Sequence, residues 1–222
     1  MPKKKSTSSS LLPPQTLQLK ISLDYSKPPI WRRVLIPNTY TLHQLHLVIQ
    51  SAFWWYNCHM YGFNLPGKER VQAVDLQSGV WEKDWLQDYQ VDSNKYLVTD
   101  ILTEPKKRLH YEYDFGDGWT HTIELEKILD ELIEKPKLIK ANNYAPVEDC
   151  GGILGWNDEI KFLKNYPNKP STDDKEHLEW LLELIPDLDE ENPKSFDPSV
   201  VNFEELAEHV ELFDADIRES DI

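Results

Sequence analysis

The chain has 222 residues, two cysteines and a formal net charge of −15, with 40% hydrophobic and 11% aromatic residues. This length suits one sizeable domain, and the aromatic content excludes a wholly disordered protein. Two cysteines are too few for a disulfide scaffold, so we expect a reducing, cytoplasmic location. The chain has no run of about 18 apolar residues, which argues against a membrane-spanning helix.

The charge is unevenly distributed along the chain. Residues 1–111 hold 14 Lys and Arg against 9 Asp and Glu, whereas residues 112–222 hold 10 against 30. Duplex DNA binding requires clustered cations, so the acidic half argues against a large phosphate-binding surface. A local basic patch formed by Arg32, Arg33 and residues 106–108 stays open as a DNA-binding face.

The first elements in chain order are a tail and two strands. Residues 1–15 contain lysines, serines and prolines but no apolar segment, which predicts a disordered tail and not a signal peptide. Alternating apolar residues predict strands over residues 17–23 and 30–36. In the second strand Arg32 and Arg33 point to opposite faces, so one of them lies near the core. There it either covers the sheet edge or binds a carboxylate or another anion.

A helix comes next. Thr41 and Gln44 form a capping-box pattern, and apolar residues at helical spacing predict a helix over residues 42–53. His43 and His46 share one side of this helix, which alone is a weak metal signal.

The segment after the helix is less regular. His59 leads into a strand of aromatic residues, and a further strand is predicted over residues 69–75. Residues 76–98 match no single pattern, and residues 99–104 indicate a short helical turn before Pro105.

Residues 113–121, with the sequence YDFGDGWTH, form the most informative stretch. Apolar residues alternate up to Phe115, glycines flank Asp117, and the alternation resumes at Trp119, which predicts a β-hairpin with a loop of about three residues. By parity His121 lies on the core side with the aromatic residues. A buried histidine there requires a hydrogen-bond partner or a ligand, and Asp117 is near enough in sequence to be that partner.

A second informative stretch is APVEDCGGILGW, residues 145–156. Glu148, Asp149 and Cys150 are potential metal ligands or acid and base groups, and the following glycines permit an unusual backbone conformation. The alternative is a fixed loop whose carboxylates cap the next helix, which we expect to begin at Asn157 or Asp158.

The remaining pattern is mainly helical. Residues 137–144 are predicted to be extended, and an acidic link is predicted over residues 186–200. Helices are predicted from residue 157 or 158, over 173–185, and over 202–213 with an Asn-x-x-Glu cap. The sequence therefore predicts an α+β fold: an antiparallel or mixed sheet with a central hairpin, packed by an N-terminal helix and C-terminal helices.

Several motifs together carry a family resemblance. They are PPIWRR (28–33), TLHQLH (41–46), the strand after His59, YDFGDGWTH (113–121), EDCGG (148–152) followed by GW, and FDPSVVNFEEL (196–206). In this order, over residues 17–212, the chain resembles the plasmid pRiA-type open-reading-frame-three-like family, also described as insertion-sequence passenger proteins of TnpR type. The resemblance implies one α+β domain over residues 16–213, an acidic tail over 214–222 and an association with mobile elements. No serine-recombinase arrangement accompanies it.

The resemblance also assigns residues to a site. Its matching positions are His46, His59, Asp114, Asp117, Trp119, His121, Glu148, Asp149 and Cys150. As candidate binding residues for an unidentified protein or small molecule we take Arg32, Arg33, His46, Asp114, Asp117 and Trp119. As candidate ligands of a divalent metal we take His59, His121, Glu148, Asp149 and Cys150.

Three functions compete on this evidence. A non-enzymatic binding or accessory protein is favoured by the aromatic composition and the absence of a nucleophile–base motif, and it requires a concave aromatic surface. A metal-dependent hydrolase or nuclease requires His59, His121 and the loop at Asp149 and Cys150 to converge in one cleft. DNA binding requires the basic residues on one exposed face.

Overall fold

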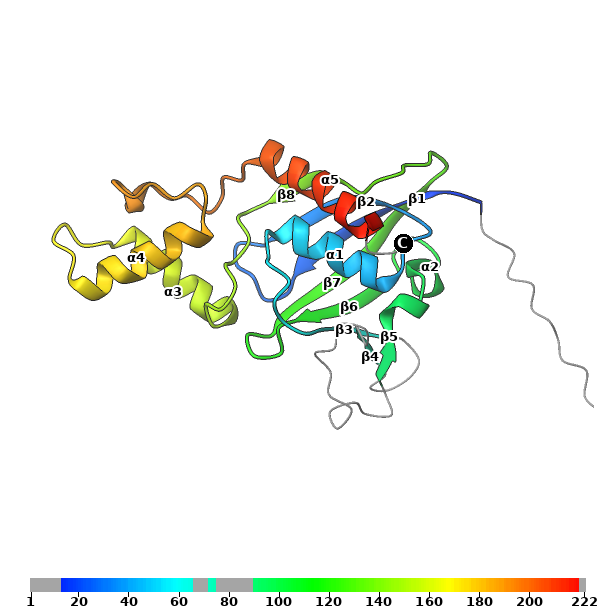
Figure 1. Ribbon diagram of the computed structural model, residues 1–222, viewed down its shortest axis with the longest axis horizontal. Coiled ribbons are helices and arrows are strands. Elements are labelled where there is room, and N and C mark those ends of the chain that lie inside the picture. The colour runs from blue at the N-terminus through cyan, green and yellow to red at the C-terminus, as the bar shows by residue number, and fades with distance from the viewer. Residues whose placement is uncertain (1–12, 66–71, 75–89, 220–222) are drawn as a thin grey trace, which may run out of the picture.

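The computed structural model describes residues 13–65, 72–74 and 90–219 of the chain. Eight strands form one sheet in the order β5-β4-β3-β6-β7-β1-β2-β8, in which only β4 and β5 are parallel (Figure 1). The strands are β1 (Thr16–Leu23), β2 (Trp31–Pro37), β3 (Tyr61–Asn64), β4 (Gln72–Val74), β5 (Gln90–Asp92), β6 (Arg108–Tyr113), β7 (Trp119–Leu129) and β8 (Lys137–Asn142). The helices are α1 (Leu42–Phe53), α2 (Val98–Ile101), α3 (Gly152–Lys164), α4 (Thr172–Leu184) and α5 (Phe203–Glu219), with 3₁₀ turns at η1 (Ser93–Lys95) and η2 (Pro193–Ser195). The α+β fold with a mixed sheet is therefore confirmed.

The hairpin of β6 and β7 lies in the middle of the sheet, where Tyr113 pairs with Trp119. Its turn is longer than the pattern predicted, because β6 ends at Tyr113 and Asp114 adopts a left-handed backbone with φ 52°. The amide of Gly118 donates to the carbonyl of Asp114 (2.6 Å), and the amide of Gly116 donates to its side chain (2.9 Å). The expectation that Phe115 continues the strand was wrong, since this residue lies in the turn and is 38% exposed.

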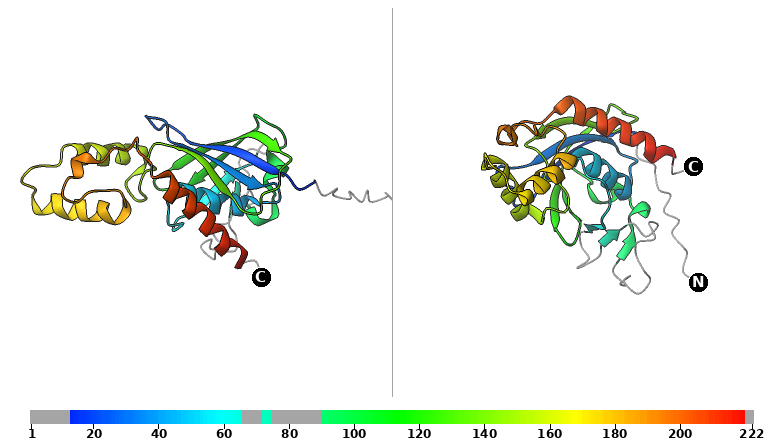
Figure 2. Two further views of the ribbon diagram at one scale, coloured as in Figure 1. Left: turned by 90° about the horizontal axis from the view of Figure 1, so that it is seen from above. Right: turned by 60° about the vertical axis from the view of Figure 1, so that its left-hand side comes forward.

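Helix α1 covers one face of the sheet, and α5 lies alongside it (Figures 1 and 2). The predicted capping box is present, with Gln44 N donating to Thr41 Oγ1 and Thr41 N donating to Gln44 Oε1. The predicted Asn-x-x-Glu cap is also present before α5, where Asn202 and Glu205 exchange hydrogen bonds. Both local signals therefore set helix starts as expected.

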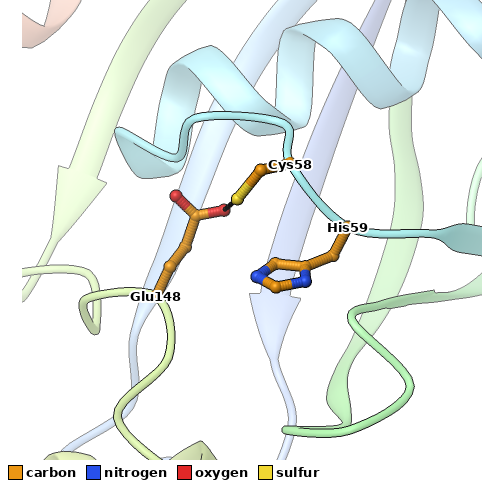
Figure 3. Close-up of side chains that lie close together, drawn as sticks. All are labelled: Cys58, His59 and Glu148. Atoms are coloured by element: carbon orange, nitrogen blue, oxygen red, sulfur yellow. Dashed lines mark hydrogen bonds between the residues drawn. The ribbon is translucent and has the colours of Figure 1, made fainter.

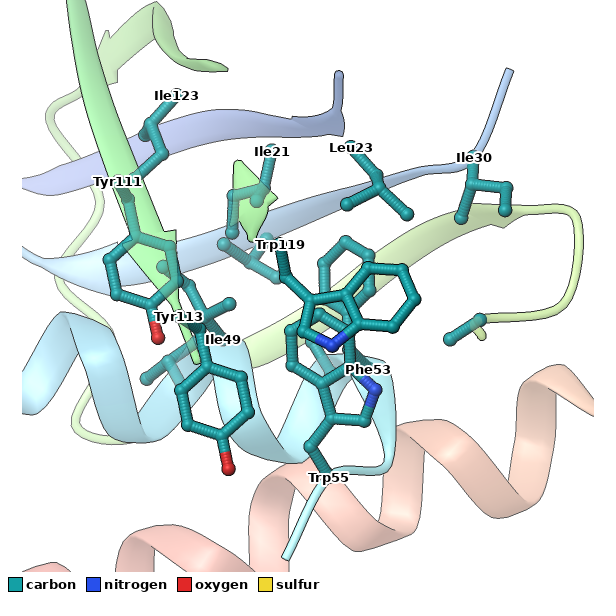
Figure 4. Close-up of a cluster of buried hydrophobic side chains, with 14 of the residues drawn as sticks. Ile21, Leu23, Ile30, Ile49, Phe53, Trp55, Tyr111, Tyr113, Trp119 and Ile123 are labelled. Carbon is teal, nitrogen blue, oxygen red and sulfur yellow. The ribbon is translucent and has the colours of Figure 1, made fainter. Parts of the chain in front are cut away.

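The core between α1 and the sheet is rich in aromatic residues (Figure 4). Tyr111, Tyr113 and Trp119 from the central hairpin pack against Phe53 at the end of α1 and Trp55 just after it. These rings are at most 4% exposed, so they hold the hairpin, the sheet and the loop after α1 in one rigid unit.

Helices α3 and α4 project beyond the end of the sheet as a pair (Figure 2). Helix α3 begins at Gly152, not at Asn157 or Asp158 as expected, because Gly151 takes a left-handed N-cap conformation with φ 86°. Two glycines thus turn the chain from the Glu148 loop directly into the helix. Helix α4 begins after Ser171, whose capping box with Asp174 the sequence analysis did not single out.

The remaining predicted elements follow the pattern in part. Residues 137–142 are extended as predicted and form β8, while only residues 72–74 of the strand predicted over 69–75 lie within the described residues. Most of the tail predicted over residues 1–15, much of the segment 76–98 and the last three residues lie outside them. In the described part of the chain, no helix has the length and apolar character needed to cross a membrane.

Candidate metal site

Three loops converge where the central hairpin turns. They are residues 54–60 between α1 and β3, residues 114–118 between β6 and β7, and residues 143–151 between β8 and α3. The indole Nε1 of Trp55 donates to the carbonyl of Pro146 (2.8 Å), and the amide of Gly151 donates to Asp117 Oδ2 (3.0 Å). The third loop is therefore tied to both of the others.

We call His59, Asp114 and Asp149 the His59 group, since each contributes a side chain from a different loop. His59 Nε2 lies 3.0 Å from Asp149 Oδ1 and 3.8 Å from Asp114 Oδ2. This nitrogen is buried and forms no hydrogen bond among the described residues, although Asp149 Oδ1 lies at ion-pair distance from it. The three potential ligand atoms lie within 4.8 Å of one another.

A second group, the Glu148 group, lies behind His59 and consists of Cys58, Tyr113 and Glu148 (Figure 3 shows Cys58 and Glu148 with His59). The buried Glu148 carboxylate accepts hydrogen bonds from the Tyr113 hydroxyl, from the amide of Tyr56 (2.6 Å) and from the Cys58 thiol (3.7 Å). Cys58, His59 and Glu148 also meet the distance criterion for three metal ligands, so His59 belongs to both clusters.

The Tyr113 hydroxyl connects the two groups. It donates to Glu148 and accepts from the amides of Cys58 (3.0 Å) and His59 (3.3 Å). Burial and the neighbouring Glu148 raise the pKa of Tyr113 well above its ordinary value, and the same two causes raise the pKa of Cys58. Both groups are thus protonated donors near neutral pH, which fixes the Glu148 carboxylate as their common acceptor.

The loop before His59 is held from its other side by His46. Asn57 Oδ1 can only accept, so His46 Nε2 carries the proton of their 2.7 Å hydrogen bond. His46 Nδ1 then accepts from the Tyr111 hydroxyl (2.7 Å), which in turn accepts from Gln50 Nε2 (3.1 Å). Burial holds the pKa of His46 well below its ordinary value, so this chain has a neutral imidazole at its centre. His46, a predicted binding residue, therefore positions a loop from within the core.

His121 and Trp119 lie in the core, away from the His59 group. The Nδ1–H of His121 donates to the carbonyl of Trp119 (2.9 Å), and its ring packs edge-on against Phe53 and Trp55. Asp117 is not its partner, contrary to expectation, because the Asp117 carboxylate faces Gly151. Burial lowers the pKa of His121 to about 3. The convergence of His59 and His121 that the enzyme hypothesis required does not occur.

Cys150 also lies apart from the His59 group. Its thiol faces the carbonyl of Gly152 (3.8 Å), and burial raises its pKa to about 12. Of the five metal ligands predicted from the sequence, His59 lies with Asp149 in one cluster and with Glu148 in the other. His121 and Cys150 belong to neither cluster of the described residues.

The basic residues do not form one exposed face. Arg32 is 1% exposed and donates to backbone carbonyls, among them Ala52 (2.7 Å) and Asn143 (2.9 Å). Arg33, on the other face, forms a two-bond pair with Glu126, and Arg108 pairs with Glu124. The arrangement that DNA binding required is therefore not present in the described part of the chain.

Two members of the site were missed by the sequence analysis. Cys58 directly precedes His59, and Tyr113 opens the YDFGDGWTH stretch, so both lay next to residues that were chosen. Strand parity placed Tyr113 in the core, and a buried hydroxyl needs a hydrogen-bond partner. This requirement could have identified Tyr113 as a member of the site.

Comparison with known proteins agrees on the family. The family model described as "Plasmid pRiA4b ORF-3-like protein" matches residues 15–205. The protein y4hQ of Sinorhizobium fredii (strain NBRC 101917 / NGR234), which is uncharacterized, is 30% identical over 197 residues, covering 88% of this chain and 90% of its own. The crystal structure of MM3350 from Methanosarcina mazei Go1, a protein of unknown function, has a TM-score of 0.62 and 29% identity, and the match covers 86% of this chain and 99% of the other.

Proposed function

This chain belongs to the plasmid pRiA4b ORF-3-like family, and we propose that it binds a divalent metal ion through His59, Asp114 and Asp149 as the centre of a hydrolytic site. The observation that carries this proposal is the buried Nε2 of His59, which forms no hydrogen bond among the described residues and has carboxylate oxygens of Asp149 and Asp114 at 3.0 and 3.8 Å. A buried polar nitrogen without a partner costs free energy, and a bound cation would satisfy it together with both carboxylates.

The spacing of the three ligand atoms suits such an ion. Ligands held at about 2.0–2.1 Å around a tetrahedral Zn²⁺ lie about 3.3 Å from each other. The two measured separations from His59 Nε2, 3.0 and 3.8 Å, fall on either side of this value. One imidazole and two carboxylates are ligands typical of Zn²⁺ and Mn²⁺ and not of a soft, thiolate-preferring ion.

The backbone around the His59 group supports a functional role. Asp114 and Asp149 both have positive φ angles (52° and 60°), and so does Asn57 (56°). Such conformations cost free energy for residues other than glycine, although Asn and Asp tolerate them best, and they accumulate at binding and catalytic sites. Hydrogen bonds to Gly116, Tyr113 and His46 hold Asp114, His59 and Asn57 in place, so two of the three ligands are oriented before an ion binds.

The exposure of the ligands favours catalysis over a purely structural site. The side chain of Asp149 is 65% exposed and that of His59 28%, whereas Asp114 is 12% exposed. Three protein ligands with one side open to solvent is the arrangement of catalytic zinc sites, while structural sites are closed by four. When bound, the ion supplies a Lewis acid and a water molecule of lowered pKa.

The loops also indicate a substrate class. Residues 54–60, 114–118 and 145–152 include no lysine or arginine. These three loops therefore offer no side-chain cation to balance the charge of a phosphate group, and we expect ester or amide substrates in preference to phosphodiesters.

The binding and accessory function, which the sequence favoured, finds less support in this geometry. The aromatic residues of the central hairpin do not form the surface that this function required, because Tyr111, Tyr113 and Trp119 are at most 1% exposed. Potential metal ligands converge at His59 instead, in a set that differs from the one expected from the sequence.

The test is calorimetric titration of Zn²⁺ and Mn²⁺ into chelator-treated, untagged protein. We expect one site per chain, with affinity lowered at least about 100-fold by His59→Ala and by Asp149→Ala. His110→Ala removes an exposed histidine, and Cys150→Ala removes a thiol outside the group, so both should bind as wild type. Ester and amide hydrolysis is then assayed with and without the ion. Failure of folded wild type to bind either ion would refute the proposal, and binding without hydrolysis in either substrate class would refute its catalytic part.

A further inference from the structure

A groove lies along one face of α3, from Ile153 near the start of the helix to Lys164 at its end. The cavity has a volume of about 390 Å³ and is formed by the turn between β1 and β2, the segment after β8, and one face of α3. This volume lies within the range of small-molecule sites. Its floor is apolar, with the buried side chains of Ile30 and Trp156, flanked by the half-buried Ile153 and Ile160.

The walls of this groove are held by hydrogen bonds. Ser26 Oγ donates to the carbonyl of Leu23 (2.8 Å) and accepts from the amide of Ile30 (2.9 Å), which fixes the β1–β2 turn. Asn143 Nδ2 donates to the carbonyl of Pro29 (2.7 Å) and joins that turn to the segment after β8. The groove therefore exists before any ligand enters, which lowers the entropic cost of binding.

The charge of the groove is opposite to that of the molecule. The chain carries −15, yet the charged residues lining the groove are Lys27, Lys161 and Lys164, without a carboxylate among them. Lys161 pairs with Asp158, and Lys164 lies near Asp197. Among the described residues, Lys27 has no ion-pair partner, so an anion entering the groove would find a free ammonium group above an apolar floor.

We propose that this groove binds a small organic anion with an apolar, preferably aromatic, body. The apolar part packs on Trp156 and Ile30, and the anionic group lies between Lys27 and Lys164. Such a site combines a mostly apolar lining with a few oriented polar groups, as small-molecule sites do. None of the residues that line the groove belongs to the His59 group, so the two sites can be tested separately.

The test is a fluorescence titration with the aromatic sulfonate 8-anilinonaphthalene-1-sulfonate, in the presence of EDTA so that a metal plays no part. The neutral analogue N-phenyl-1-naphthylamine serves as a probe of apolar binding alone. We expect saturation at one probe per chain, and about tenfold or greater loss of affinity in the double variant Lys27→Glu/Lys164→Glu. The double variant Lys20→Glu/Lys140→Glu, which changes the charge equally near Trp31, should bind as wild type.

Three outcomes would overturn the proposal. They are no saturable binding by the folded wild type, equal affinity in the groove variant and the control variant, and equal affinity for the neutral analogue. Far-ultraviolet circular dichroism on each variant establishes that it is folded before its affinity is compared. Because the metal is absent throughout, failure here leaves the metal site unaffected, and failure of the metal titration leaves this groove unaffected.

Discussion

At the residue scale, the Tyr113 hydroxyl determines how the candidate site is held. It joins the buried Glu148 carboxylate to the backbone of Cys58 and His59, so the orientation of His59 depends on a phenol that hydrogen-bonds to none of the three ligand side chains of the His59 group. Residues that hydrogen-bond to metal ligands commonly change metal affinity by about 10- to 100-fold.

Tyr113→Phe removes these three hydrogen bonds and little else. We expect the free energy of unfolding to fall by about 1–3 kcal/mol, because Glu148 stays buried with fewer donors. Zn²⁺ affinity should fall by about 10- to 100-fold. Urea denaturation and calorimetry measure the two effects. Unchanged metal affinity in a destabilised variant would show that the hydroxyl serves the fold alone.

Burial of His121 makes the stability of the fold depend on pH in the acidic range. Its pKa is about 3 in the folded protein and about 6.5 when unfolded, so below pH 6.5 the unfolded chain binds the extra proton. Stability contributed by the neutral ring is complete above pH 6.5 and is lost as the pH falls toward 3, by about 1.4 kcal/mol per pH unit. Buried His46 acts in the same direction.

His121→Leu removes the contribution of His121 to this pH dependence and leaves that of His46. Between pH 6 and 4.5, the free energy of unfolding of the variant should therefore fall less steeply than that of wild type, by about 1.4 kcal/mol per pH unit. Urea denaturation in EDTA at several pH values gives both slopes. Parallel slopes would mean that His121 is protonated in the folded protein and that its surroundings are not apolar.

At the element scale, close approach between the hairpin turn and the start of α3 brings the ligands together. A Cβ atom on Gly152 would lie 2.5 Å from the carbonyl oxygen of Asp117, and Gly152 has φ 70°. Gly118 has nearly the same φ (69°), but a Cβ there would meet nothing within 4 Å. An alanine at either position would have a strained backbone, but only an alanine at Gly152 would also clash with a neighbouring residue.

We expect Gly118→Ala to cost about 1–2 kcal/mol, the price of a left-handed conformation. Gly152→Ala should cost about 1–3 kcal/mol more, because the Asp117 turn must move. Only Gly152→Ala should also weaken metal binding, since it displaces the loop that carries Asp149. Thermal denaturation measures the loss of stability in both variants, and calorimetry measures their metal affinity. Equal effects of the two substitutions would mean that the contact between the turn and α3 relaxes without consequence.

The elements themselves were largely predictable, but their contacts were not. Local signals identified β1, β2, α1 and the central hairpin, because alternation and capping are properties of neighbouring residues. The start of α3 was missed, since the left-handed Gly151 is stabilised by Asp117 from a distant turn. Strand parity correctly placed His121 in the core. His59 lies in a loop before a strand, where no periodic pattern predicts that its side chain is partly exposed.

At the scale of the whole molecule, the two candidate sites use different residues around α3. The His59 group includes Asp149 from the loop before the helix, and the groove runs along the helix itself. The family motifs contribute to the His59 and Glu148 groups and also to the groove, which Ile30 and Trp156 line. The three lysines of the groove lie outside those motifs. The strong negative charge in the second half of the chain therefore does not describe every surface, because the groove carries lysines alone.

The central claim is that a metal ion lies between His59, Asp114 and Asp149. Anomalous diffraction from crystals grown with Zn²⁺, recorded on both sides of the zinc absorption edge, tests it most directly. The account predicts one strong anomalous peak per chain, within about 2.3 Å of His59 Nε2 and of a carboxylate oxygen from each aspartate. A peak elsewhere, or stoichiometric zinc in solution with no peak at His59, would contradict it.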